Sequence, residues 1–181
     1  ITSCNFWSYS ILILQMKNLN NKKILFIICG GISAYKSLET IRILKKNGAE
    51  IKTILTSSAK EFVTPLSVAS LSQGKVYSDL FSLENETEMD HISLSRWADV
   101  VVVAPITANT ISKLAQGTTN DLASTVILAS NKQIYLAPAM NVRMWEHKST
   151  KINLKKLKDF GYKFIGPEIG DMACGEYGEG K

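Results

Sequence analysis

The run from Val100 to Ala104, four valines and an alanine followed by Pro105, is the feature that most constrains the fold. A strand without alternating polar residues is buried on both faces, as in a parallel sheet that helices cover on each side. Similar apolar runs lie at residues 24–29 and 134–137, and further strands are expected at residues 51–55 and 162–165. Helical periodicity lies between them at residues 34–47, 107–116, 120–131 and 149–160. The alternation predicts one doubly wound α/β domain, Rossmann-like or flavodoxin-like, with a parallel sheet.

The composition narrows the class of protein. A chain of 181 residues is long enough for one well-buried domain, and its hydrophobic fraction of 45% is ordinary for a globular protein. The net charge of +5 comes with lysines on predicted helix faces and without interleaved aromatic residues, which argues against a nucleic-acid groove. Three cysteines without CxxC spacing and two distant histidines predict neither a disulfide framework nor a metal site. We expect a cytoplasmic protein with reduced thiols.

The two ends of the chain differ from its middle. Residues 1–15 carry no charge, and their apolar run is too short to span a membrane, so we expect a disordered or non-native extension and no membrane association. The expected domain covers residues 22–181. Its last part, residues 166–181, is rich in glycine, which is typical of a flap or clamp over a binding site.

The stretch from Pro138 to Trp145 follows the predicted strand at residues 134–137. In an open α/β sheet the ligand binds beyond the carboxyl ends of the strands. Asn141 is therefore a candidate site residue, because its amide can donate to a carboxylate and accept from an amine or hydroxyl. A plain strand-to-loop turn explains the same residues equally well, since Pro and Asn are common in turns.

Three further loops are expected at the same edge of the sheet, and each suits an anionic ligand. Gly30-Gly31-Ile32-Ser33 opens a helix, although it is not a full GxGxxG motif. Thr56-Ser57-Ser58 offers three hydroxyls, and Thr107-Ala108-Asn109-Thr110 offers two hydroxyls and an amide. Helix capping explains Thr107 without a ligand. Four such loops together predict a pocket of the size of a mononucleotide.

Four motifs resemble those of the FMN-dependent cysteine decarboxylases. They are APITANT at residues 104–110, HISL at 91–94, PAMNxxMW at 138–145 and GDxACG at 170–175. The resemblance covers roughly residues 22–181 and implies an FMN cofactor. It implies that FMN is held by Gly31, Ile32, Thr56, Ser58, Thr107, Asn109 and Thr110. It implies catalytic roles for His91, Asn141 and Cys174, and substrate contacts from Asn141, Met144 and Ala173.

Within that family the motifs are most similar to those of enzymes of coenzyme A biosynthesis that convert 4′-phosphopantothenoylcysteine to 4′-phosphopantetheine. The resemblance implies a homo-trimer or a dodecamer, and a phosphopantothenate–cysteine ligase as a fused domain or separate partner. The chain departs from the family at Ile106 (usually Ala), Asn120 (commonly Asp) and Lys181 (usually Arg). Lysine keeps the charge but loses the bidentate fork, so a phosphate clamp at that position would be weaker.

Other functions stay open on the sequence. His91 could cap a helix, and Cys174 could be an inert small residue. A decarboxylase of peptidyl cysteine would use the same pocket, and a non-catalytic flavin-binding regulatory protein would keep only part of the set of His91, Asn141 and Cys174. A flavin prenyltransferase would lack that set.

Overall fold

The computed structural model describes residues 19–78 and 90–180, and the expected extension at residues 1–15 lies outside them. Six parallel strands form one sheet in the order β3-β2-β1-β4-β5-β6. The strands are β1 (Lys23–Ile28), β2 (Glu50–Leu55), β3 (Val76–Tyr77), β4 (Val100–Ile106), β5 (Gln133–Pro138) and β6 (Lys163–Phe164). This order confirms the doubly wound α/β fold, with the sheet order that is typical of dinucleotide-binding folds.

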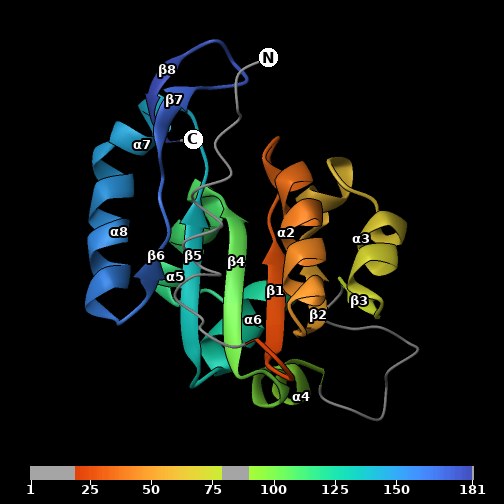
Figure 1. Cartoon of the computed structure of the whole chain (residues 1–181). Coiled ribbons are helices and arrows are strands. Elements are labelled where there is room, and N and C mark those ends of the chain that lie inside the picture. The colour runs from red at the N-terminus through yellow and green to blue at the C-terminus, as the bar shows by residue number, and fades with distance from the viewer. Residues whose placement is uncertain (1–18, 79–89, 181) are drawn as a thin grey trace.

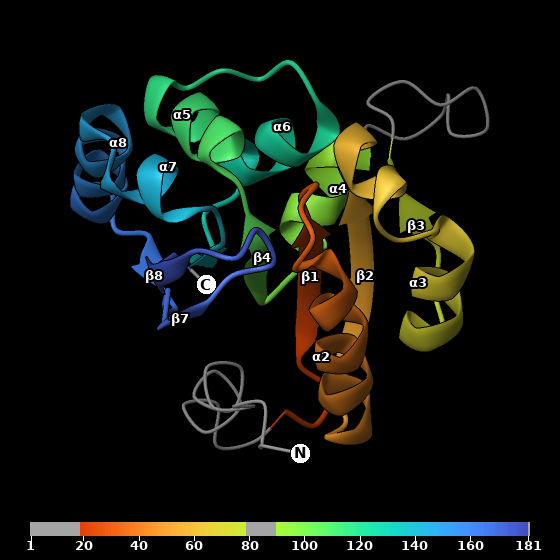
Figure 2. The same ribbon diagram turned by 90° about the horizontal axis from the view of Figure 1, so that it is seen from above.

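Helices cover both faces of the sheet (Figure 1, Figure 2). The helical elements are α2 (Ala34–Lys46), η1 (Ser57–Glu61), α3 (Pro65–Ser72), α4 (Asp90–Trp97), α5 (Ala108–Gln116), α6 (Leu122–Ala129), α7 (Val142–Glu146) and α8 (Lys148–Asp159). Phe26 of β1 packs in one core cluster with α2 and α3, whereas its neighbours Leu25 and Ile27 pack in the other with α4, α5, α6 and α8. Every residue of β4 is buried, as the run of valines predicts.

Three features differ from the expected elements. The helix predicted over residues 120–131 is shorter: Asp121 accepts a hydrogen bond from Ser124 N at 2.8 Å and so starts α6 at Leu122, and Ser130 leaves the helix with extended backbone. The short helix α7 lies in a stretch that the sequence placed in a loop. The glycine-rich tail forms an antiparallel hairpin of β7 (Ile169–Asp171) and β8 (Tyr177–Glu179).

Candidate functional site

The loops that follow β1, β2, β4 and β5 meet at one edge of the sheet. Cys29 N donates to Pro105 O at 3.1 Å, and Ala139 N donates to Ile106 O at 3.1 Å, so the ends of β1, β4 and β5 are joined by backbone hydrogen bonds. Thr56 N donates to Ile28 O at 3.1 Å and joins the end of β2 to β1. Because α2 and α5 pack on opposite faces, the loops after β1 and β4 leave the sheet in opposite directions. Open α/β sheets hold their ligand in a crevice at such a switch point, and these loops border the crevice expected here.

The loop after β1 leaves the amino end of α2 open to a ligand. Gly30 lies so close to the next loop that an added Cβ would come within 2.6 Å of Ser58 Cβ and Oγ, which explains the glycine. At Gly31 an added Cβ would meet nothing within 4 Å. Ser33, the N-cap of α2, makes no capping hydrogen bond with its side chain, and the first turn carries no acidic residue. Ala34 N and Lys36 N already donate to Gly31 O at 2.9 Å and to Ser33 O at 3.0 Å, so the attraction of this helix end for an anion comes mainly from the helix dipole.

Hydroxyl groups line the two neighbouring loops. Thr56 Oγ1 and Ser58 Oγ lie 3.4 Å apart after β2. Thr107 caps α5 and accepts from Thr110 N at 3.4 Å, while Asn109 is exposed beside it. Thr110 is buried, and its hydroxyl donates to Cys29 Sγ at 3.4 Å, so this side chain points into the protein and not toward the crevice.

Burial raises the pKa of the Cys29 thiol to about 11, and the hydrogen bond from Thr110 acts in the opposite direction. The thiol is therefore protonated at neutral pH and is a poor nucleophile. Cys29 supports the loops from behind, as a packed residue at the end of β1.

Asn141 is positioned by the start of α7. Its Oδ1 accepts a hydrogen bond from Met144 N at 2.8 Å, which makes Asn141 the N-cap of this helix. Because Oδ1 is used in this way, the Nδ2 protons are the groups that Asn141 can donate to a ligand. Met144 is 46% exposed next to it, whereas Trp145 is buried in the core and does not line the crevice.

The hairpin carries Cys174 at its turn, above the same edge of the sheet (Figure 1). The turn is closed by hydrogen bonds from Met172 N to Glu176 O at 2.8 Å and from Gly175 N to Met172 O at 3.0 Å. Ala173 and Cys174 are exposed, and Cys174 Sγ lies 3.7 Å from Glu176 Oε2. Met140 N donates to Gly180 O at 2.9 Å, so the hairpin is tied to the loop that holds Asn141.

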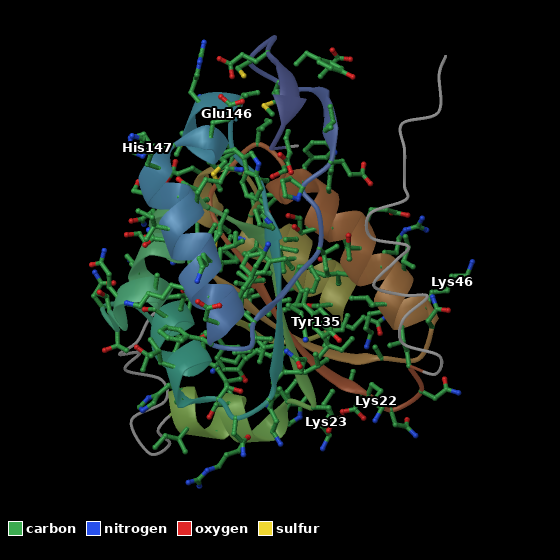
Figure 3. All side chains as sticks on the ribbon, turned by 90° about the vertical axis from the view of Figure 1, so that its left-hand side faces the viewer. Lys22, Lys23, Lys46, Tyr135, Glu146 and His147 are labelled. Carbon is green, nitrogen blue, oxygen red and sulfur yellow. The ribbon has the colours of Figure 1, made fainter. Side chains whose placement is uncertain are left out.

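His91 is not brought to this group within one chain. It lies in the first turn of α4, which crosses the edge where β1 and β4 begin (Figure 1). Asp99 N, just after α4, donates to the backbone oxygen of Lys23 at 2.8 Å. Figure 3 shows that Lys23 and the end of α7, marked by Glu146 and His147, lie at opposite edges of the sheet.

The described part of the chain shows neither a cluster of metal ligands nor a membrane-spanning helix. Within residues 19–78 and 90–180 no three His, Cys, Asp or Glu side chains gather as metal ligands. None of the helices found there has the length and apolar character needed to cross a membrane.

Sequence reasoning missed Val142, Gly178 and Gly180, which join the hairpin to α7. An added Cβ on Gly178 would come within 2.8 Å of Val142 Cγ2, and one on Gly180 within 2.5 Å of Met140 O. The sequence signal for this contact is the GxG spacing of Gly178 and Gly180. Residues two apart on a strand face the same side, so two glycines at this spacing indicate a close approach of another segment on that side.

The chain is similar to known proteins over most of its length. The family model described as Flavoprotein matches residues 13–181. The coenzyme A biosynthesis bifunctional protein CoaBC of Haemophilus influenzae is 45% identical over 163 residues, which are 90% of this chain and 41% of that protein. The chain spans about two fifths of the length of such curated relatives.

Two solved structures share the fold. A cysteine-to-serine mutant of PPC decarboxylase complexed with pantothenoylaminoethenethiol matches with a TM-score of 0.78 at 31% identity, over 89% of this chain and 90% of that one. The FMN binding protein AtHal3 matches with a TM-score of 0.75 at 33% identity, over 89% of each chain. Because the family model matches residues 13–181, which is most of the chain, the chain belongs to the flavoprotein family.

Proposed function

We propose that this chain is an FMN-dependent decarboxylase that converts 4′-phosphopantothenoylcysteine to 4′-phosphopantetheine in coenzyme A biosynthesis, in the cytoplasm. The observation that carries the proposal is the grouping of Asn141, Met144 and the Cys174 hairpin beside the hydroxyl-lined crevice at one edge of the sheet. The likeness to PPC decarboxylase and to CoaBC supports the substrate. A ligase, in the same polypeptide or as a separate protein, would then supply the cysteinyl substrate.

The residues present fit FMN. The open space at Gly31 lets a phosphate approach the uncapped amino end of α2, with Ile32, 60% exposed, beside it. Thr56, Ser58, Thr107 and Asn109 offer hydroxyls and an amide to the phosphate or the ribityl chain. Thr110 would contribute through its backbone and by packing, since its hydroxyl is bonded to Cys29.

Bound FMN would remove two electrons from the cysteinyl group, which gives its carboxylate the electron sink that it otherwise lacks, and would return them after carbon dioxide has left. Asn141 would donate from Nδ2 to this carboxylate and fix its orientation. Oxidation and loss of carbon dioxide leave an enethiol. The compound bound to the PPC decarboxylase mutant, pantothenoylaminoethenethiol, is such an enethiol and supports this order of events.

Cys174 would supply the proton that completes the saturated thiol product. Its position on an exposed turn lets Sγ–H approach a substrate held beneath the hairpin, and the Glu176 carboxylate next to it can orient the thiol. The hairpin would also exclude water from the crevice.

His91 would act as a base or as a partner of the substrate thiolate, and it would reach the site from a neighbouring copy of the chain, because α4 lies at the opposite edge. We therefore propose a homo-oligomer, a trimer or an assembly of trimers. Exposed apolar side chains at the amino ends of α2 and α3 support an interface beside the crevice: Ile32, Tyr35, Phe62 and Leu66.

The visible spectrum of the purified protein and a decarboxylation assay test the proposal. We expect a yellow protein that binds FMN and releases carbon dioxide and 4′-phosphopantetheine from 4′-phosphopantothenoylcysteine. A peptide that ends in cysteine serves as the competing substrate. A colourless protein that does not take up added FMN would refute the cofactor, and preferential turnover of the peptide would refute the substrate.

A further inference from the structure

The strand β8 and Gly180, which directly follows it, contact the chain on both sides of Asn141. Met140, which precedes Asn141, donates its N–H to Gly180 O at 2.9 Å. Val142, which follows Asn141, packs its methyl groups against Gly178, where an added Cβ would come within 2.8 Å of Val142 Cγ2. The residue proposed to hold the substrate carboxylate therefore lies between the two points that carry the hairpin.

Both contacts require glycine. Gly180 has a φ of +136°, where side chains other than glycine are rarely found, and an added Cβ would meet Met140 O at 2.5 Å. Gly178 pairs with Gly170 across the hairpin, so neither strand carries a side chain at this level. The backbone of β8 can thus approach the start of α7 more closely than any other residue type at position 178 would allow.

The hairpin depends for its position on these two contacts, the hydrogen bond from Met140 to Gly180 and the packing of Val142 on Gly178, which together we call its seat. A two-stranded hairpin is marginally stable by itself in water. Ile169 is 67% exposed and Tyr177 is 71% exposed, so these side chains do not anchor it to the described part of the chain. On the side of β8, the hairpin is therefore attached to the Asn141 loop through the contacts of Gly178 and Gly180.

We infer that Gly178 and Gly180 are positioning residues, which seat the hairpin on the Asn141 loop and so fix the distance between Cys174 and Asn141. The inference rests on the proposed function, in which Asn141 holds the carboxylate and Cys174 supplies the last proton. A side chain at position 178 displaces the hairpin and Cys174, but it leaves the hydrogen bond between Asn141 Oδ1 and Met144 N in place. Substrate binding is then kept while completion of the thiol product is impaired.

The test compares four forms of the FMN-loaded enzyme with the parent: Gly178→Ala, Val142→Ala, the double variant, and Gly74→Ala as a control. Gly74 lies in the turn before β3, and an added Cβ there would be 3.4 Å from Ile51 O, an ordinary contact. We expect Gly178→Ala to lower kcat for the thiol product about 100-fold, because a displacement of about 1 Å costs that much, while KM changes little. In a single turnover, enethiol should accumulate in its place, in an amount equal to the flavin that stays reduced.

Val142→Ala removes the methyl groups that a new Cβ would meet, so the double variant should regain most of the parent kcat and release thiol again. Gly74→Ala should behave as the parent does. A Gly178→Ala variant with the parent kcat and product would overturn the inference. A double variant that stays as impaired as Gly178→Ala would also overturn it. If Gly178→Ala alone does not fold, the double variant is compared with the parent, and the inference requires that it folds and keeps most of the parent kcat.

The rate of limited proteolysis at the turn of residues 172–176 reports how firmly the hairpin is held on the Asn141 loop, and it does not require catalytic turnover. Cleavage should be faster in Gly178→Ala and return to the parent rate in the double variant. If the parent does not decarboxylate the substrate, the proposed function fails, whereas unchanged cleavage in Gly178→Ala refutes the seat itself.

Discussion

At the scale of single residues, the two described cysteines have opposite surroundings. Cys29 is fully packed behind the crevice, and Cys174 is exposed on the turn of the hairpin. A thiol acts as a proton donor or nucleophile only where a partner can reach it. We therefore expect Cys174 to act as a proton donor and Cys29 to act as a packed core residue. Each expectation can be tested separately.

Replacing Cys174 with Ser should leave FMN bound and stop the reaction at the enethiol. A hydroxyl is a much weaker acid than a thiol, so proton transfer should slow by at least about 100-fold. Visible spectroscopy follows the flavin, and mass spectrometry separates enethiol from thiol. Release of thiol at the parent rate would show that another group delivers the proton.

We expect the free energy of unfolding to depend on pH in the alkaline range because of Cys29. Its pKa is about 11 in the folded chain against an ordinary 9.0, so the folded state holds this proton more tightly than the unfolded state does. The stabilisation is complete below pH 9 and is lost as the pH rises through 11, by roughly 3 kcal/mol in all. Urea unfolding of the parent and of Cys29→Ala over this range checks it. The variant should be less stable overall but show a flatter decline, and equal slopes would contradict the assignment.

At the scale of elements, Asp121 joins two helices beside the site. It caps α6, and it accepts from Lys113 Nζ of α5 at 2.6 Å. Burial raises the pKa of its carboxyl, but the hydrogen bonds from Lys113 and Ser124 outweigh burial and leave the pKa below its ordinary value. The ionised form therefore stabilises the fold above that value, and the contribution is lost as pH falls.

Asp121→Ala should lower the free energy of unfolding by about 1–2 kcal/mol, because it removes both the cap and the ion pair. Asp121→Asn keeps the cap and should cost less. Thr64→Ala is the matched control, since Thr64 caps α3 by accepting from Ser67 N at 3.1 Å without an ion pair. Urea denaturation measures all three. If Asp121→Asn proved as unstable as Asp121→Ala, the ion pair with Lys113 would outweigh the cap.

The elements also show how far sequence patterns reach. The apolar runs at residues 24–29, 100–104 and 134–137 predict strands correctly, because a strand that is buried on both faces consists almost entirely of apolar residues. The helix expected over residues 120–131 was wrong at both ends, since a cap at Asp121 competes with apolar periodicity that extends beyond it. The helix α7 has five residues, too few to show a period, and the hairpin has glycines where alternation would be visible.

At the scale of the whole molecule, the candidate residues lie at two opposite edges. The motifs alone grouped His91 with Asn141 and Cys174, but they carry no information on which edge of the sheet each segment reaches. The Asn141 loop was predictable because it directly follows a strand. The placement of α4 was not, since it depends on the path of the chain from β3 to β4.

Mixing two inactive variants tests whether sites form between copies of the chain. His91→Asn removes the proposed base, and Asn141→Asp keeps the cap on α7 but replaces the amide donors with a second acceptor. Refolding equal amounts together should restore about a quarter of the parent activity in a cyclic oligomer, because one site in four then combines both intact residues. Activity that stays absent in a mixture of confirmed hetero-oligomers would place His91 and Asn141 in the same copy.

The full burial of β4 has a consequence for how a ligand could come and go. The strand β4, whose end borders the candidate site, is buried along its whole length, whereas the hairpin beside the site is two short strands held by the seat at Val142 and Met140. Local opening free energies range from near zero at such surface elements up to the global value in the core. Exchange of a bound molecule can therefore be rapid in a protein that unfolds slowly, since lifting the hairpin breaks none of the pairing of β4.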